Sequence, residues 1–93
     1  MSSARPILLT RHAQLRMVER GVREDDVRAA VLTGRREPAQ HGLFAYRLRV
    51  DFNSVWKGRY YEAQELEVIA AEEDEAVVVV TVYAFYSRGR GRR

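Results

Sequence analysis

The first part of the chain places apolar side chains at the spacing of a helix. Ala13, Met17 and Val18 recur at short intervals and predict one narrow buried face. Thr10 precedes them as a good N-cap, and Gly21 follows as a C-terminal stop. A first helix is therefore predicted between Thr10 and Gly21.

A second helix is predicted between Arg23 and Gly34. Val27, Ala30 and Val31 share its apolar face. Arg23 is a poor N-cap, but acidic residues follow it in the first turn, where negative charge complements the helix dipole. The glycine at the far end supplies the stop.

Beyond residue 42 the pattern changes from helical to alternating, as is typical of strands. The turn signal Asn53–Ser54 separates two of them. Residues 62–71 are ambiguous, because their composition favours a helix while Glu-Leu-Glu-Val alternates like a strand. Residues 76–85 are nearly all β-branched or aromatic and are expected to form the central strand, covered on both faces. Strands are predicted over residues 5–9, 46–52, 55–61, 65–71 and 76–85, with a loop over residues 35–42.

Length and composition limit what the chain can be. Ninety-three residues make one domain, which we place at residues 1–86, followed by a disordered Arg/Gly tail at residues 87–93. The order β-α-α-β-β-β-β predicts an α+β fold, with two N-terminal helices packed on one mainly antiparallel sheet of four to five strands. The absence of cysteine excludes a disulfide and a cysteine nucleophile. No apolar run has the length of a signal-peptide core or a membrane span, so we expect a cytoplasmic protein without a membrane partner.

Charge is unevenly distributed along the chain. Residues 1–36 carry eight Arg against four acidic residues, whereas residues 62–75 carry seven acidic residues and no basic one. Nearly all of the basic residues are Arg, which suits bidentate phosphate contacts. This bias indicates a polyanionic partner such as RNA, and a bias in genome composition explains it equally well.

His12, Arg16 and Arg20 recur every four residues, which stacks them along one stripe of the first helix. A helix that needs only solubility more often alternates acid with base. The stripe is therefore a candidate anion-binding surface with an acid–base residue at its head. Ion pairs with Glu19 or with the acids of the second helix explain the two arginines nearly as well, and a capping role explains His12 as well.

The stretch TRHAQLRMVERGV, residues 10–22, and the stretch TVY, residues 81–83, together resemble the bacterial domain-of-unknown-function 4258 family. Its members typically open with T-x-H-A-x-x-R-M-x-x-R-G-[IV] and close on T-V-Y. The resemblance spans about residues 8–85 and implies a fold similar to the RelE/ParE toxin superfamily, many of whose members are metal-independent endoribonucleases. It also implies a cognate acidic antitoxin as a protein partner. The family usually has Ser or Thr where Arg23 stands, which weakens the second helix cap and leaves the chemistry untouched.

Metal-free cleavage of RNA requires a base for the 2′-hydroxyl, a cation for the phosphorane and an acid for the leaving oxygen. His12 is the candidate base, and Arg16 is the candidate cation. Tyr83 is the candidate donor if it reaches the same face, although a place in the core is the favoured explanation of this residue. Arg20 would hold a neighbouring phosphate.

Further basic and aromatic residues are candidates for nucleic-acid binding. WKGRYY, residues 56–61, mixes cations with rings as base-stacking proteins do, although strands are also rich in aromatics. The basic face of residues 46–52 and the Arg-rich tail would add phosphate contacts, and a solvated surface explains them equally well. The candidates are Arg20, Arg47, Arg49, Trp56, Lys57, Arg59, Arg88 and Arg90.

We predict neither a metal nor a cofactor. The four acids at residues 72–75 point in different directions at a hairpin tip and make a poor cage. His41 lies in a loop without a matching ligand, and no role is assigned to it. The leading hypothesis is a toxin-like, metal-independent endoribonuclease, and the alternative is a non-catalytic module that binds nucleic acid or protein. The sequence leaves the oligomeric state open, including a dimer through a sheet edge.

Overall fold

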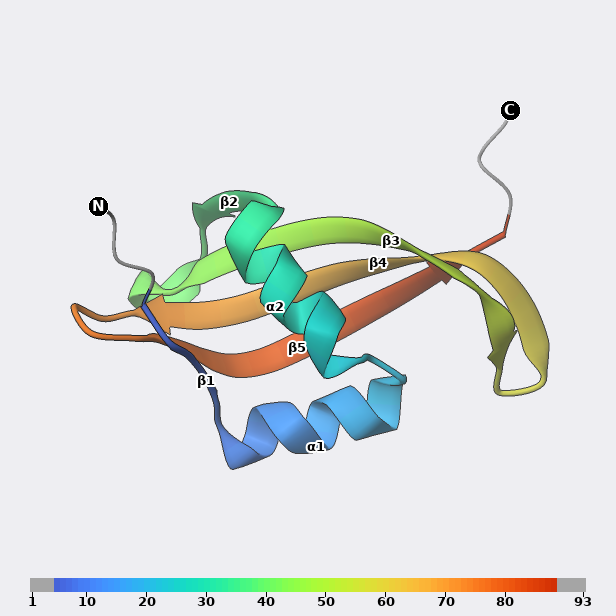
Figure 1. Ribbon diagram of the computed structural model, residues 1–93, viewed down its shortest axis with the longest axis horizontal. Helices are drawn as coiled ribbons and strands as arrows, with labels where there is room; N and C mark the ends of the chain where they lie inside the picture. Colours follow the sequence, from blue (N-terminus) through green and yellow to red (C-terminus); the bar gives the residue numbers. More distant parts are fainter. Residues whose placement is uncertain (1–4, 89–93) are drawn as a thin grey trace.

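The computed structural model describes residues 5–88 of the chain (Figure 1). Helices and strands follow in the predicted order β-α-α-β-β-β-β, which confirms the α+β class. They are β1 (Ile7–Leu9), α1 (Arg11–Arg20), α2 (Glu24–Thr33), β2 (Arg35–Pro38), the 3-10 turn η1 (Gln40–Gly42), β3 (Phe44–Trp56), β4 (Arg59–Glu72) and β5 (Val77–Ser87). The predicted tail begins within β5 at Ser87, and its residues 89–93, which include Arg90, lie outside the described residues.

All five strands form one sheet in the order β1-β5-β4-β3-β2. β1 pairs in parallel with β5, and the other neighbouring strands are antiparallel. The middle strand is β4, so the prediction that residues 76–85 form the central strand is wrong. The ambiguous segment 62–71 lies within β4 and is strand throughout.

The predicted turn at Asn53–Ser54 is also wrong. β3 continues through these residues to Trp56, and its pairing with β4 shifts register between Asp51 and Ser54. The chain reverses at Lys57–Gly58, where both residues have positive φ, 52° and 82°. Such dihedral angles are typical of a two-residue hairpin, because they match the twist of the paired strands. The predicted strands 46–52 and 55–61 therefore belong to a single long hairpin.

The predicted loop over residues 35–42 contains a further strand. Residues Arg35–Pro38 form β2, which pairs with β3 at the edge of the sheet. A charged edge strand of this kind lacks the apolar alternation by which strands are recognised.

α2 covers one face of the sheet, and α1 runs beside β5 where β1 ends (Figure 1). Ala13 and Met17 of α1 are buried as predicted, but Val18 is 77% exposed, because a helix at the sheet edge buries only a narrow stripe.

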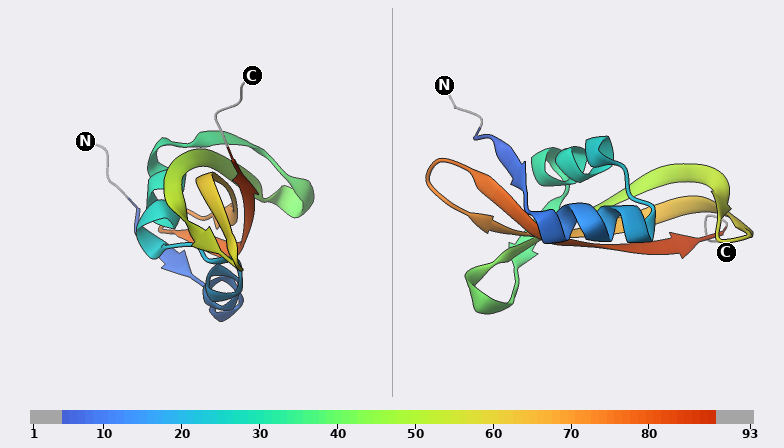
Figure 2. Two further views of the ribbon diagram at one scale, coloured as in Figure 1. Left: turned by 90° about the vertical axis from the view of Figure 1, so that its right-hand side faces the viewer. Right: turned by 90° about the horizontal axis from the view of Figure 1, so that it is seen from below.

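Turn η1 projects from the face opposite α2 (Figure 2, right), which we call the outer face. Within residues 5–88, no helix has the length and apolar character needed to cross a membrane. The fully buried core consists of Ala13, Val27, Ala30, Leu66, Val68, Ala70, Val79 and Val82.

Side chains cover the outer edge of β1. Arg28 donates from Nη1 to the carbonyl of Ile7 at 3.3 Å, and Gln14 donates from Nε2 to the carbonyl of Leu9 at 3.2 Å. Both carbonyls lie on the edge strand of the sheet. Their lone pairs are thus partly occupied by the chain itself.

Glu72, at the end of β4, joins three strands. Arg36 of β2 donates to both carboxylate oxygens, from Nε at 2.6 Å and from Nη2 at 2.8 Å. The hydroxyl of Tyr46 on β3 also donates to this carboxylate. The hydrogen bond from Arg36 lowers the pKa of Glu72 to about 2, and burial raises the pKa of Tyr46.

Candidate functional site

Tyr83 lies on the outer face of the sheet. Side chains alternate along β5, so Tyr83 and Phe85 point away from α2 while Val82 and Ala84 face it. Tyr83 is 40% exposed and Phe85 is 55% exposed. The favoured interpretation of Tyr83 as a core residue is therefore wrong, and its ring is accessible to a ligand.

Arg20, the last residue of α1, contacts this tyrosine. Its Cζ atom lies 4.9 Å from the centroid of the Tyr83 ring, which is cation–π geometry. Its Nη1 donates to the carbonyl of Val82 at 2.9 Å. A guanidinium carries five N–H donors, so this bond leaves donors that can bind a phosphate.

The first turn of α1 is anchored on β5. The Thr10 hydroxyl accepts from the N–H of Ala13 at 3.0 Å, which confirms the predicted N-cap. The backbone N–H of Thr10 donates to the carbonyl of Val79 at 3.1 Å. The helix therefore begins at a fixed point beside β5.

Gln64 and Tyr86 hold the other end of α1, which carries Arg20. Gln64 is buried and donates from Nε2 to the carbonyl of Gly21 at 3.1 Å and to the Tyr86 hydroxyl oxygen at 3.0 Å. The Tyr86 hydroxyl donates to the carbonyl of Arg20. Burial raises the pKa of Tyr86, so the hydroxyl stays protonated and keeps its donor role. Gly21 has a φ of 71°, and a Cβ there would lie 2.7 Å from the Trp56 ring.

The predicted stripe on α1 is present, and its members have different surroundings. Arg20 meets Tyr83, whereas Arg16 forms an ion pair with Glu19 on the helix surface. His12 is exposed in the first turn. Within residues 5–88, no hydrogen bond, ion pair or ring contact joins His12 or Arg16 to Tyr83. The structure therefore brings together one arginine of the stripe and the tyrosine.

A pocket of about 380 Å³ opens beside Tyr83 on the outer face. Thr81 and Glu67 line it from the sheet, and His41 lines it from turn η1. His41 has a left-handed backbone, with φ 60° and ψ 33°, which is uncommon outside glycine and is often found at functional sites. The remaining lining residues are Ala39, Gln40, Leu43, Ile69 and Val80.

Glu67 is linked to the basic residues of β3. Arg47 approaches Glu67 Oε2 with Nη2 at 3.0 Å and donates from Nε to Glu37 Oε2 at 2.7 Å. These carboxylates raise the pKa of Arg47, and Arg47 lowers the pKa of Glu37. Arg49 is exposed on the same face, opposite Glu65. Over residues 5–88 no three His, Asp or Glu side chains are grouped so that they could hold a metal ion.

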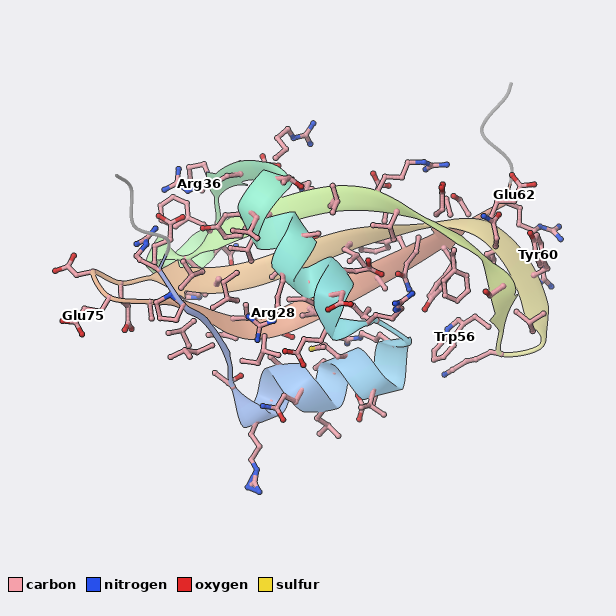
Figure 3. All side chains as sticks on the ribbon, in the orientation of Figure 1. Arg28, Arg36, Trp56, Tyr60, Glu62 and Glu75 are labelled. Atoms are coloured by element: carbon pink, nitrogen blue, oxygen red, sulfur yellow. The ribbon has the colours of Figure 1, made fainter. Side chains whose placement is uncertain are left out.

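The aromatic and basic hairpin residues lie apart from this pocket. The Trp56 ring stacks on Tyr86 with centroids 5.7 Å apart and planes inclined by 14°, so it faces the end of α1 (Figure 3). Lys57 Nζ lies 5.5 Å from the Trp56 ring centroid, and Arg59 is exposed at the turn. Trp56 therefore already has a stacking partner within the protein. Arg88 is exposed just after β5.

Sequence reasoning assigned no role to His41 and did not single out Glu67. Turn η1 lies over the outer face and brings His41 close to Glu67 of β4, which forms the pocket. No local sequence pattern predicts where this turn lies. The alternation Glu-Leu-Glu-Val in β4 does show that Glu67 faces away from the core.

A family model described as "Domain of unknown function (DUF4258)" matches residues 9–84. This segment contains Arg20, His41, Glu67 and Tyr83. No curated protein and no solved structure matches the chain.

Proposed function

The chain belongs to the domain-of-unknown-function 4258 family, DUF4258, and from this premise we propose that it is a metal-independent endoribonuclease of toxin type that holds RNA on its outer face. The observation that carries the proposal is the contact between Arg20 and the exposed ring of Tyr83. A cation and a hydroxyl donor are then adjacent on an accessible surface. The likeness to RelE/ParE toxins, which the sequence motif implies, adds the reaction type.

The outer face has the chemistry that RNA requires. Tyr83 and Phe85 offer exposed rings on which unpaired bases can stack. Arg20 lies over the Tyr83 ring, and the exposed Arg49 lies on the same face of the sheet. Their guanidinium groups can neutralise phosphates, so binding should weaken as salt concentration rises.

Cleavage without a metal divides between three groups in this proposal. His12 takes the proton from the 2′-hydroxyl, which then attacks the adjacent phosphorus. Arg16, one turn of α1 from His12, stabilises the negative charge of the phosphorane once it leaves Glu19, and Arg20, a further turn along, holds the neighbouring phosphate. Tyr83 donates a proton or a hydrogen bond to the leaving 5′-oxygen. A cognate acidic antitoxin would act by covering these cations.

A non-catalytic RNA-binding module is the second candidate. The ion pair between Arg16 and Glu19 favours it, because this arginine already has an anionic partner. The exposed rings and Arg20 serve binding equally well without any proton transfer.

The test uses end-labelled single-stranded RNA in EDTA with the full chain and its variants. Wild type should cleave the RNA, and His12→Ala and Tyr83→Phe should lose most of this activity while keeping the wild-type circular dichroism spectrum. Arg11→Ala is the matched control, because Arg11 is exposed next to His12 and lies off the stripe. Cleavage by neither wild type nor control, together with salt-sensitive RNA binding, would replace the nuclease with the binding module. Full activity in His12→Ala would remove His12 from the mechanism.

A further inference from the structure

The pocket beside Tyr83 is placed to receive part of a nucleotide. Arg20 lies over the Tyr83 ring, and Tyr83 also lines the pocket. A ligand whose phosphate lies at Arg20 can therefore extend past this ring into the pocket. The volume of about 380 Å³ falls within the range of roughly 300–1,000 Å³ for small-molecule sites.

The lining of the pocket suits a planar ring with one polar edge. Leu43, Ile69 and Val80 supply apolar surface, which favours burial of an aromatic ring. Glu67 and Thr81 supply polar groups from neighbouring strands. Unpaired nucleobases have this combination of an apolar face and a hydrogen-bonding edge.

The Glu67 carboxylate is a lining group that can distinguish one base from another. An ionised carboxylate only accepts hydrogen bonds, and Arg47 meets Glu67 through Oε2 at 3.0 Å. On its Watson–Crick edge, guanine presents adjacent N1–H and N2–H donors. Adenine and cytosine place an acceptor next to their donor, and uracil places acceptors on both sides of its single donor, so each brings a lone pair against the carboxylate.

From this juxtaposition of Glu67, His41 and Tyr83 we propose that the pocket binds a guanine base of the RNA, with the Glu67 carboxylate accepting from the N1–H and N2–H groups. The inference rests on the proposed RNA-binding function and deepens it by naming the base. His41 covers the pocket from turn η1 and packs against the bound ring.

An organic cation is the competing ligand, because a carboxylate beside an aromatic ring also attracts amines and guanidinium groups. Charge around the pocket argues against it. Arg47 already pairs with Glu67, and Arg20 lies over Tyr83. A third cation would meet repulsion from both.

The experiment measures the binding of the four ribonucleoside 5′-monophosphates to the full chain by calorimetry or NMR titration at fixed salt. Guanosine monophosphate should bind roughly tenfold or more tightly than the other three, as expected for one bidentate contact. Glu67→Gln should abolish this preference, because the amide replaces one acceptor by a donor. Glu65→Gln is the matched control, since Glu65 lies on the same face of β4 and outside the pocket. His41→Ala should weaken all four nucleotides together.

Several results would overturn the guanine pocket. They are equal affinity for the four nucleotides, no binding of any of them at millimolar concentration, a guanine preference that survives Glu67→Gln, and displacement of guanosine monophosphate by methylguanidinium. Binding of guanosine monophosphate without RNA cleavage would refute the nuclease and leave the pocket standing. RNA cleavage without any nucleotide preference would support the nuclease and refute the guanine pocket.

Discussion

Acid should selectively remove the stabilisation that comes from Glu72. The hydrogen-bonded ion pair with Arg36 lowers the pKa of the Glu72 carboxyl from the ordinary 4.5 to about 2. A lowered pKa means that the stabilising charge is fully present above about pH 4.5 and is lost as pH falls towards 2. The protein should therefore lose stability across this window, and Glu72→Gln should make it insensitive to that part of the loss.

The magnitude follows from the shift and from exposure. The lowering of the Glu72 pKa from 4.5 to about 2 sets an upper limit of about 3.4 kcal/mol on this stabilisation. The Glu72 side chain is only 16% exposed, but its partner Arg36 is 49% exposed, and solvent screens such a pair. We therefore expect Glu72→Gln to lower the free energy of unfolding by about 1–2 kcal/mol at pH 7.

Urea unfolding of wild type and Glu72→Gln, from pH 7 down to the lowest pH at which both unfold cooperatively, measures the difference. The gap should be widest above pH 4.5 and should close as pH falls. Glu75→Gln is the control, because Glu75 projects from the hairpin tip away from Arg36 (Figure 3). A gap that stays constant with pH, or one of equal size in the control, would contradict this reasoning.

Two further predictions concern packing and are measured by urea unfolding. Gly21→Ala should lower the free energy of unfolding by about 2 kcal/mol or more, because it combines a positive φ with a Cβ placed 2.7 Å from the Trp56 ring. Gly58→Ala, with a similar φ in open space, should lower it by only about 1 kcal/mol. Equal losses in the two variants would argue against the contact with Trp56. Leu66→Ala should lower the free energy of unfolding by about 2–5 kcal/mol, because Leu66 is fully buried. Leu15→Ala, at a half-exposed position, should change it by less than about 1 kcal/mol. A comparable loss in Leu15→Ala would show that this exposed side of α1 is packed.

The helices could be predicted from the sequence because their information is local. The Thr10 cap bonds to Ala13 as expected, and Gly34 ends α2. Val18 was predicted wrongly, because helical periodicity does not reveal that α1 lies at an edge and buries only part of its apolar surface.

The hairpin turn could not be placed from local residues alone. Asn53–Ser54 and Lys57–Gly58 are both plausible turns by composition. The choice depends on pairing between strands, which continues to Trp56 opposite Arg59 and absorbs the first pair as a register shift. The sequence does not predict β2 for a related reason. Its own residues lack a strand pattern, and only its pairing with β3 makes it a strand.

For the candidate site, the stripe on α1 was visible in the sequence and its partner was not. Four-residue spacing placed Arg20 on a face, but only the packing of α1 against β5 brings it to Tyr83, far along the chain. The predicted roles of His12, Arg16 and the phosphate-binding arginines remain predictions. The pocket under His41 depends on how turn η1 lies over the sheet, which no spacing encodes.

The short strand β1 has a consequence for aggregation. Its three residues pair with Val77–Val79, at the start of a β5 rich in valine, and such segments are prone to stack into fibrils once their edge is free. Arg28 and Gln14 hold β1 by its outer carbonyls. If β1 detaches, the Val77–Val79 segment of β5 becomes an uncovered edge. Variants that loosen this strand, such as Arg28→Ala, should therefore form fibrils more readily than the wild type.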